Sequence, residues 1–249
     1  MTAKQLFQAG QLKEAIQALG TEVRDNPTDA QRRTFLFELL CFAGEYDRAE
    51  KHLNLLAEGN KQTELGAVLY HSALHGMKTR EKTFNEKDFP AGTAATERTF
   101  SGTINGQPFQ TIVDADPRIG PRLELFAAGA YLWIGFEHIE SIELQAPKRL
   151  RDMLWAPAIV RTGPTFKQTE LGEILIPVVY PFSYRNSDGA VPLGRTTVWE
   201  EDSEYGALPS GQKMFLVDDE EFPFLEVRKI EFHTTTEDTD DTADAAVAE

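Results

Sequence analysis

The feature that most constrains the fold is a repeat of 34 residues in the first third of the chain. The recurring positions hold glycine, a large side chain, alanine and leucine: Gly10 and Gly44, Leu12 and Tyr46, Ala15 and Ala49, Leu19 and Leu53. A period of this length is typical of the tetratricopeptide repeat, in which two helices pack across a tight turn. Glycine suits the turn, and alanine suits the point of closest helix approach. The sequence therefore predicts a tetratricopeptide-like helical domain over residues 1–80.

Five helices are expected in this domain, and the last opens an unfinished third repeat. Pro27 ends the second helix, because proline cannot continue a helix. An array this short leaves an apolar end, which we expect the rest of the chain to cover. The alternative is a plain α-helical bundle whose sequence happens to resemble a repeat. The predicted helices span residues 2–9, 11–24, 29–43, 45–58 and 62–77.

Tetratricopeptide units resemble protein-binding modules in which the first helix of each repeat lines a groove for a peptide or helix. The groove positions carried onto this chain are Phe7, Thr34, Glu38, Cys41, Val68 and His75. The set mixes apolar, polar and charged side chains, as suits an amphipathic guest helix. Each residue taken singly is also compatible with an ordinary surface or core position.

The remainder of the chain is predicted to be rich in strands. Residues 81–97 are polar and contain a Pro-Ala-Gly breaker, so we expect a linker there. Asn105-Gly106 separates two alternating apolar runs, which is typical of a hairpin with a type I′ turn. Further short strands over residues 98–233 indicate a small antiparallel barrel or a curled sheet. The predicted fold is thus two-domain α + β, with tetratricopeptide-like α-helical repeats followed by a β-rich antiparallel barrel-like domain.

Composition narrows the range of partners. A net charge of −15 disfavours binding to DNA or to an anionic membrane, since both need clustered lysine and arginine. No apolar run reaches the roughly 18 residues of a membrane helix. The single cysteine, Cys41, suits a reducing cytoplasm. Residues 234–249 are rich in aspartate and glutamate and are predicted to form a disordered acidic tail.

Two groups of residues raise the alternative of chemistry. Carboxylates and a histidine gather in residues 114–140, as Asp114, Asp116, Glu124, Glu137, His138 and Glu140. Such a set could hold a divalent ion or run acid–base chemistry, so a metal-binding protein or a hydrolase is the alternative function. His71 and His75 lie four residues apart on a predicted helix, but no third ligand follows them. Packing, loop capping and salt bridges account for both groups more simply, so we predict no catalytic residue, metal or cofactor.

Five short motifs follow one another in the β-rich half: Arg122-Leu-Glu124, Phe126-Ala-Ala-Gly129, Tyr131-Leu-Trp133, Phe136 to Ile142, and Leu150 to Trp155. In this order they resemble the ImpE family, also called TagJ-type accessory proteins of bacterial type VI secretion. The resemblance extends over residues 1–233. It implies a non-enzymatic adaptor in the bacterial cytoplasm, which contacts a helix of the small subunit of the contractile sheath. Through that subunit it implies a link to the AAA+ ATPase that recycles contracted sheaths.

The segment from Pro147 to Trp155 combines basic and apolar faces and also matches the family pattern. Arg149 and Arg151 are therefore expected to contact either the partner or the helical domain. An interdomain salt bridge that fixes the two halves is the simpler expectation for these arginines.

Overall fold

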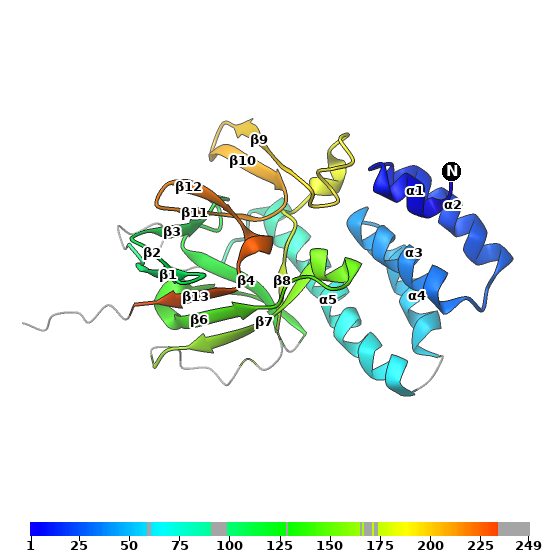
Figure 1. Cartoon of the computed structure of the whole chain (residues 1–249), viewed down its shortest axis with the longest axis horizontal. Coiled ribbons are helices and arrows are strands. Elements are labelled where there is room, and N and C mark those ends of the chain that lie inside the picture. Colours follow the sequence, from blue (N-terminus) through cyan, green and yellow to red (C-terminus); the bar gives the residue numbers. More distant parts are fainter. Residues whose placement is uncertain are drawn as a thin grey trace, which may run out of the picture.

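The computed structural model describes residues 1–58, 61–90, 99–127, 129–164, 166, 171 and 174–233. Five helices open the chain; the first four lie on one side of the molecule, and the fifth runs between them and the strands (Figure 1). The predicted helices are confirmed in number and order. Their bounds are α1 (Ala3–Gln8), α2 (Leu12–Asp25), α3 (Ala30–Phe42), α4 (Tyr46–Ala57) and α5 (Lys61–Glu86).

The repeated glycines and alanines lie where the 34-residue period predicts. Gly10 and Gly44 have φ values of +76° and +69° in the turns before α2 and α4. Ala15 and Ala49 are both 0% exposed, so neither position has room for a larger side chain. The local sequence therefore sets the geometry of each helix pair.

Helix α5 is longer than the sequence predicts and continues nine residues past the expected end at residue 77. Ala73, Met77, Arg80 and Phe84 follow helical spacing and are buried, so one face of the helix stays in the core to its last turns. The polar residues between them lie on the other faces. The helix thus enters the segment predicted to be a linker, of which residues 91–97 lie outside the described residues. The division into domains stays a prediction, as does the acidic tail, which also lies outside the described residues.

The larger sheet is antiparallel, with eight strands in the order β2-β1-β13-β6-β7-β8-β4-β5. A second sheet has the order β12-β11-β3, and β9 pairs with β10 alone. The strands are β1 (Gly102–Ile104), β2 (Gln107–Phe109), β3 (Ile112–Asp114), β4 (Arg122–Ala127), β5 (Ala130–Gly135), β6 (Ile139–Leu144), β7 (Trp155–Thr162), β8 (Ile174–Pro177), β9 (Thr197–Asp202), β10 (Gly206–Gly211), β11 (Met214–Val217), β12 (Glu220–Pro223) and β13 (Lys229–Phe232).

The sheet-rich second half is as predicted, but a closed barrel is not observed. Strands β2 and β5 end the order of the larger sheet, and among the described strands no pairing joins them. The hairpin at Asn105-Gly106 is confirmed, because Ile104 pairs with Gln107 and both turn residues have positive φ. Pro108 lies in β2, an edge strand, where its missing N–H breaks no pairing within the sheet.

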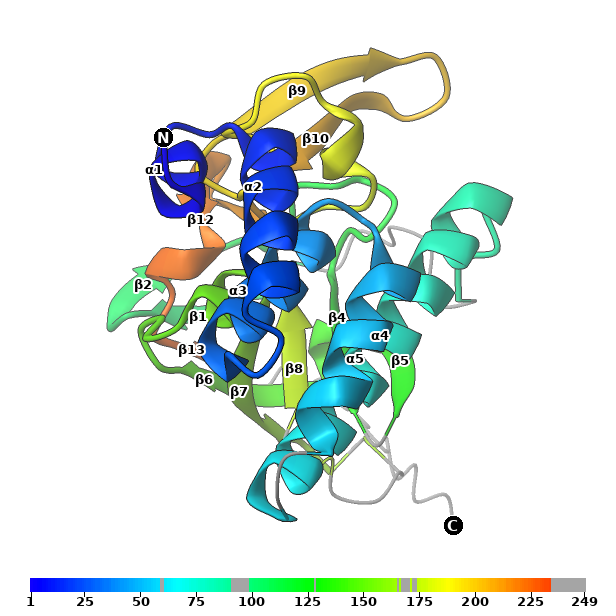
Figure 2. The ribbon, with the colours of Figure 1, turned by 90° about the vertical axis from the view of Figure 1, so that its right-hand side faces the viewer.

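The helices share one apolar cluster with part of the sheet, and a second cluster fills the strand-rich half. Trp155 on β7 is 1% exposed, and its ring lies 6.4 Å from that of Phe37 on α3 and 5.9 Å from that of Tyr70 on α5. Leu175 on β8 joins the same cluster. Seen from the helical side, the helices lie in front of the strands they cover (Figure 2). The apolar end of the short repeat array is therefore covered by the rest of the chain, as expected.

We expect Gly44→Ala to lower the free energy of unfolding by about 1–3 kcal/mol. The positive φ at Gly44 disfavours a side chain, and an added Cβ would lie 2.6 Å from the ring of Tyr184. The matched control is Gly20→Ala in α2, where an added Cβ meets nothing within 4 Å and helix propensity rises. Urea denaturation of both variants checks this, and equal effects would contradict it.

Candidate functional site

Phe7, the first predicted groove position, is half-buried on α1 beneath a segment of the strand-rich half. The Arg195 guanidinium lies 4.8 Å from the centroid of the Phe7 ring. Its Nη1 and Nη2 donate to the carbonyl oxygens of Gln8 and Phe7 at 3.0 and 2.9 Å. The chain itself therefore occupies this position.

Glu38 and Arg151, two further predicted partner-binding residues, contact one another. The Arg151 side chain extends from η2 (Leu150–Met153), a 3₁₀ helix, and its Nε lies 3.3 Å from Glu38 Oε1. The contact is an ion pair without an aligned hydrogen bond at Nε. The same guanidinium lies 4.9 Å from the Tyr70 ring centroid. Burial raises the pKa of Glu38, and the Arg151 charge opposes that rise. The expected interdomain salt bridge is thus present at Arg151.

The other predicted groove residue in the second half of α3, Cys41, is 2% exposed and belongs to the shared core. Burial raises the pKa of its thiol well above the usual range, as a buried structural cysteine requires. Thr34, one turn before Glu38, is half-buried. This face of α3 is therefore turned largely toward the interior.

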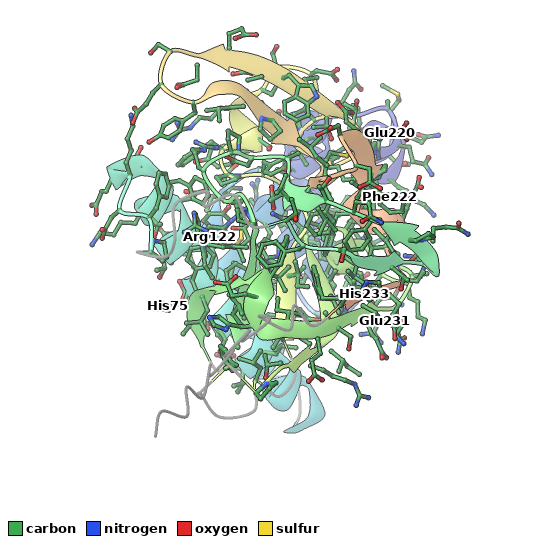
Figure 3. The ribbon with its side chains drawn as sticks, turned by 90° about the vertical axis from the view of Figure 1, so that its left-hand side faces the viewer. His75, Arg122, Glu220, Phe222, Glu231 and His233 are labelled. Carbon is green, nitrogen blue, oxygen red and sulfur yellow. The ribbon has the colours of Figure 1, made fainter. Side chains whose placement is uncertain are left out.

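Val68 and His75 lie on an exposed face of α5, seven residues apart and so on one side of the helix. Val68 is 61% exposed, which is unusual for a β-branched apolar residue in a packed helix. Figure 3 shows His75 on the opposite side of the view from Glu231 and His233. The predicted groove residues thus differ in exposure, since Glu38 and Cys41 are buried whereas Val68 and His75 are exposed.

A different groove is open where α5 meets β6, β7 and η2. Its volume is about 930 Å³, and we call it the α5–β7 groove. Its apolar lining comes mainly from Leu69, Tyr70, Trp155, Pro157 and Ile159. A smaller cavity of about 550 Å³ lies between α2 and α4 and is lined mostly by polar side chains. The larger groove therefore offers the better apolar surface of the two.

The charged lining of the α5–β7 groove is mainly basic. It comprises Lys148, Arg149, Arg228 and Lys229, together with the acidic Glu143 and Asp152. Arg149 was predicted to bind the partner, whereas the other three basic residues were not predicted. Lys148 adjoins Arg149 in the predicted segment and could have been included with it. Lys229 could not have been predicted from the sequence, because only the pairing of β13 with β6 brings it beside Glu143.

Two of the six predicted residues, Asp114 and Glu124, are buried in an ion network that joins α5 to the strands. Arg80 Nε and Nη2 donate to the two oxygens of Glu124 at 2.7 and 2.6 Å. Lys213 Nζ lies 2.8 Å from Glu124 Oε1 and 2.5 Å from Asp114 Oδ2. The Tyr180 hydroxyl donates to Asp114 Oδ1 at 3.0 Å. All four charged groups are nearly inaccessible to solvent, so each charge is compensated within the protein.

The network shifts the pKa of its two acids in opposite directions. Burial alone would raise the pKa of Glu124, but the Arg80 and Lys213 charges outweigh it and hold that pKa at about 2. Burial raises the pKa of Asp114 to about 6, and Lys213 only partly opposes it. These side chains serve as internal partners for two buried cations. Neither cation was predicted, although Arg80 continues the buried spacing of α5.

The rest of the carboxylate group lies elsewhere. Asp116 is buried and accepts from Arg118 Nε and Nη2 at 2.8 and 2.6 Å. His138 Nε2 lies 3.9 Å from Glu137 Oε1 in a 3₁₀ helix, and Glu140 is exposed on β6. Within the described part of the chain, no three histidine, cysteine, aspartate or glutamate side chains are grouped to hold a metal ion. No described helix is both long and apolar enough to cross a membrane.

We expect Glu124→Gln to destabilise the protein by about 3–5 kcal/mol at pH 7, since it leaves buried cations uncompensated. Because the folded-state pKa of Glu124 is lowered to about 2, its stabilising charge is present above its unfolded pKa and is lost as the pH falls toward 2. The difference in free energy of unfolding between wild type and variant should therefore become smaller as the pH is lowered from 5 to 3. Urea denaturation across this range checks it. Glu221→Gln, at an exposed position, is the control and should leave the free energy of unfolding unchanged at each pH. A stability difference for Glu124→Gln that did not change with pH would refute the lowered pKa of Glu124.

Comparison with known proteins agrees with this architecture. The tetratricopeptide repeat model matches residues 6–69, which favours a repeat over a plain helical bundle. The protein of Pseudomonas aeruginosa named type VI secretion system accessory component TagJ is 29% identical over 270 residues, which cover 94% of this chain and 92% of that protein. The crystal structure of protein VPA1032 from Vibrio parahaemolyticus shares the fold, with a TM-score of 0.78 and 21% identity over 93% of this chain and 97% of that chain. The ImpE protein model matches residues 106–231, half of this chain, and the chain therefore belongs to the ImpE family.

Proposed function

We propose that this chain is a non-enzymatic adaptor of a bacterial type VI secretion system, acting in the cytoplasm. It binds one helix of the small subunit of the contractile sheath and so links that subunit to the AAA+ ATPase that recycles contracted sheaths. Family membership supports an accessory role, as does the name of the Pseudomonas aeruginosa relative. The tetratricopeptide-like helices support recognition of another protein.

The α5–β7 groove is the observation that carries this proposal. Among the predicted groove positions, Phe7 and Glu38 are engaged by Arg195 and Arg151 of the same chain. A guest helix therefore needs another surface. The α5–β7 groove has an apolar lining, and Ile159 at its side is 59% exposed although it is a large apolar residue. Exposed apolar side chains beside a groove are typical of a protein interaction surface.

Helix-in-groove recognition suits the apolar lining of this surface. An α-helix with its side chains is about 10–12 Å across and buries one apolar stripe. Tyr70, which is half-buried, supplies rigid aromatic surface at the groove, and residues of this type dominate the energetics of protein interfaces. Binding of this kind positions a partner without turnover, as an adaptor requires.

We expect Ile159→Asp to weaken binding of the sheath small subunit at least roughly tenfold, because a charge replaces apolar contact area. Isothermal titration of the full-length chain with the purified subunit measures this. Leu55→Asp is the matched control, since Leu55 is 50% exposed on α4 and does not line the groove. Absence of binding by the unmodified chain at micromolar concentrations would refute the proposed function. Equal losses in both variants would instead refute the placement of the helix.

A further inference from the structure

We infer that the α5–β7 groove selects an acidic amphipathic helix, with carboxylates flanking its apolar stripe. The inference rests on the proposed function and adds the chemistry of the partner. It identifies Lys148, Arg149, Arg228 and Lys229 as the residues that determine specificity.

The lining of the groove is mainly basic, whereas the chain as a whole is acidic. The protein carries a net charge of −15, yet four basic side chains and only two acidic ones line this groove. One of the acids, Asp152, is already committed, since its Oδ2 accepts the backbone N–H groups of Lys148 and Arg149 at 2.9 Å each. A local basic patch on an acidic protein attracts an acidic partner and repels basic ones.

The basic side chains come from separate segments that the fold brings together. Lys148 and Arg149 precede η2, whereas Arg228 directly precedes β13 and Lys229 is its first residue. Lys229 pairs in register with Glu143 of β6, whose end leads toward Lys148. Four cations from two neighbouring segments at one apolar groove suit a guest that carries carboxylates beside its apolar stripe.

The existing contacts of Lys148, Arg149 and Lys229 leave these side chains available to a guest, whereas Nη1 of Arg228 already donates to the carbonyl oxygens of Leu225 and Val227 at 2.8 and 2.6 Å. The ion pair of Lys229 with Glu231, at 2.6 Å, joins two exposed side chains and is worth little in water. The Lys148 ammonium donates to the neutral Gln145 amide at 2.8 Å. Arg149 is exposed. A carboxylate on a guest helix would replace weak contacts with charge-assisted hydrogen bonds.

A nucleic acid or an anionic membrane is a poorer fit than an acidic protein segment. Both require extended basic surfaces, whereas this patch is one groove on a strongly acidic chain. The apolar lining formed by Leu69, Tyr70 and Pro157 also calls for apolar side chains on the guest. An amphipathic helix provides both features.

Two synthetic peptides test this without the sheath subunit. Each is a helix of about 20 residues with leucine and alanine along one face. One carries glutamate on both flanks of that face, and the other carries lysine at the same positions. Fluorescence anisotropy with the full-length chain should show micromolar binding of the glutamate peptide, weakened by added salt, and at least roughly tenfold weaker binding of the lysine peptide.

The double variant Arg149→Glu/Lys229→Glu should bind the glutamate peptide roughly tenfold or more weakly than the wild-type chain does, and should bind the lysine peptide more tightly. Lys82→Glu is the control, because Lys82 is 71% exposed on α5 and does not line the groove. Circular dichroism spectra should match across the variants. Equal binding of the two peptides, or equal effects of the double variant and the control, would overturn the inference.

The acidic end of the same chain is the competing occupant. Binding of the glutamate peptide that appears only after residues 234–249 are removed would identify that segment as the occupant and overturn the choice of a partner helix. These outcomes are separate from the proposed function. A sheath subunit that binds equally to the wild-type chain and the double variant refutes the inference and leaves the adaptor role intact.

Discussion

Arg80 and Glu124 are two opposite charges removed from water, and their pairing determines how the helices sit on the strands. Arg80 lies on the last helix of the repeat array, and Glu124 lies 44 residues later on β4, the strand beside the edge strand β5. Each would be costly alone in the interior, so each requires the other in one position. Lys213 extends the requirement to a segment much later in the chain. The ion pair thus sets the relative orientation of the two halves, which apolar packing alone constrains less sharply.

This orientation explains why the surface expected to bind a partner is largely engaged. The strand-rich half packs against the faces of α1 and α3 that usually remain open in tetratricopeptide arrays, and Arg195 and Arg151 reach Phe7 and Glu38 there. The same packing creates a new groove where α5 meets the sheet. The partner-binding surface would then lie at the junction of the two halves and not on the helices alone.

The sequence predicts well what local chemistry decides. The glycines and alanines of the repeat specify the first four helices within a few residues, and Asn105-Gly106 specifies a hairpin, because each signal acts over a few neighbouring residues. The end of α5 was missed because its last turns are polar on most faces, and burial of Arg80 depends on Glu124 far along the chain. Whether the sheet closes into a barrel could not be predicted either. That depends on pairings between distant segments, such as that of β1 with β13, which lie at opposite ends of the second half.

The candidate site was predicted only in part, for the same reason. Arg149 does line the groove, but Arg228 and Lys229 join it only through the pairing of β13 with β6. Glu38 and Cys41 follow the repeat pattern, yet the pattern contains no information about what covers that face of α3. The carboxylates near residue 114 suggest an ion site until their buried cations, Arg80 and Lys213, are placed beside them.

The buried face of α5 has a consequence for the growth of this architecture. Solenoid proteins lengthen by duplicating units, because each new unit finds an apolar face on the previous one. Here that face at the final unit is already occupied by Phe126 and the ring of Trp155. Insertion of another helical pair after α5 would displace the sheet and separate Arg80 from its acid. The buried face of α5 therefore limits the number of helical units that this architecture can hold.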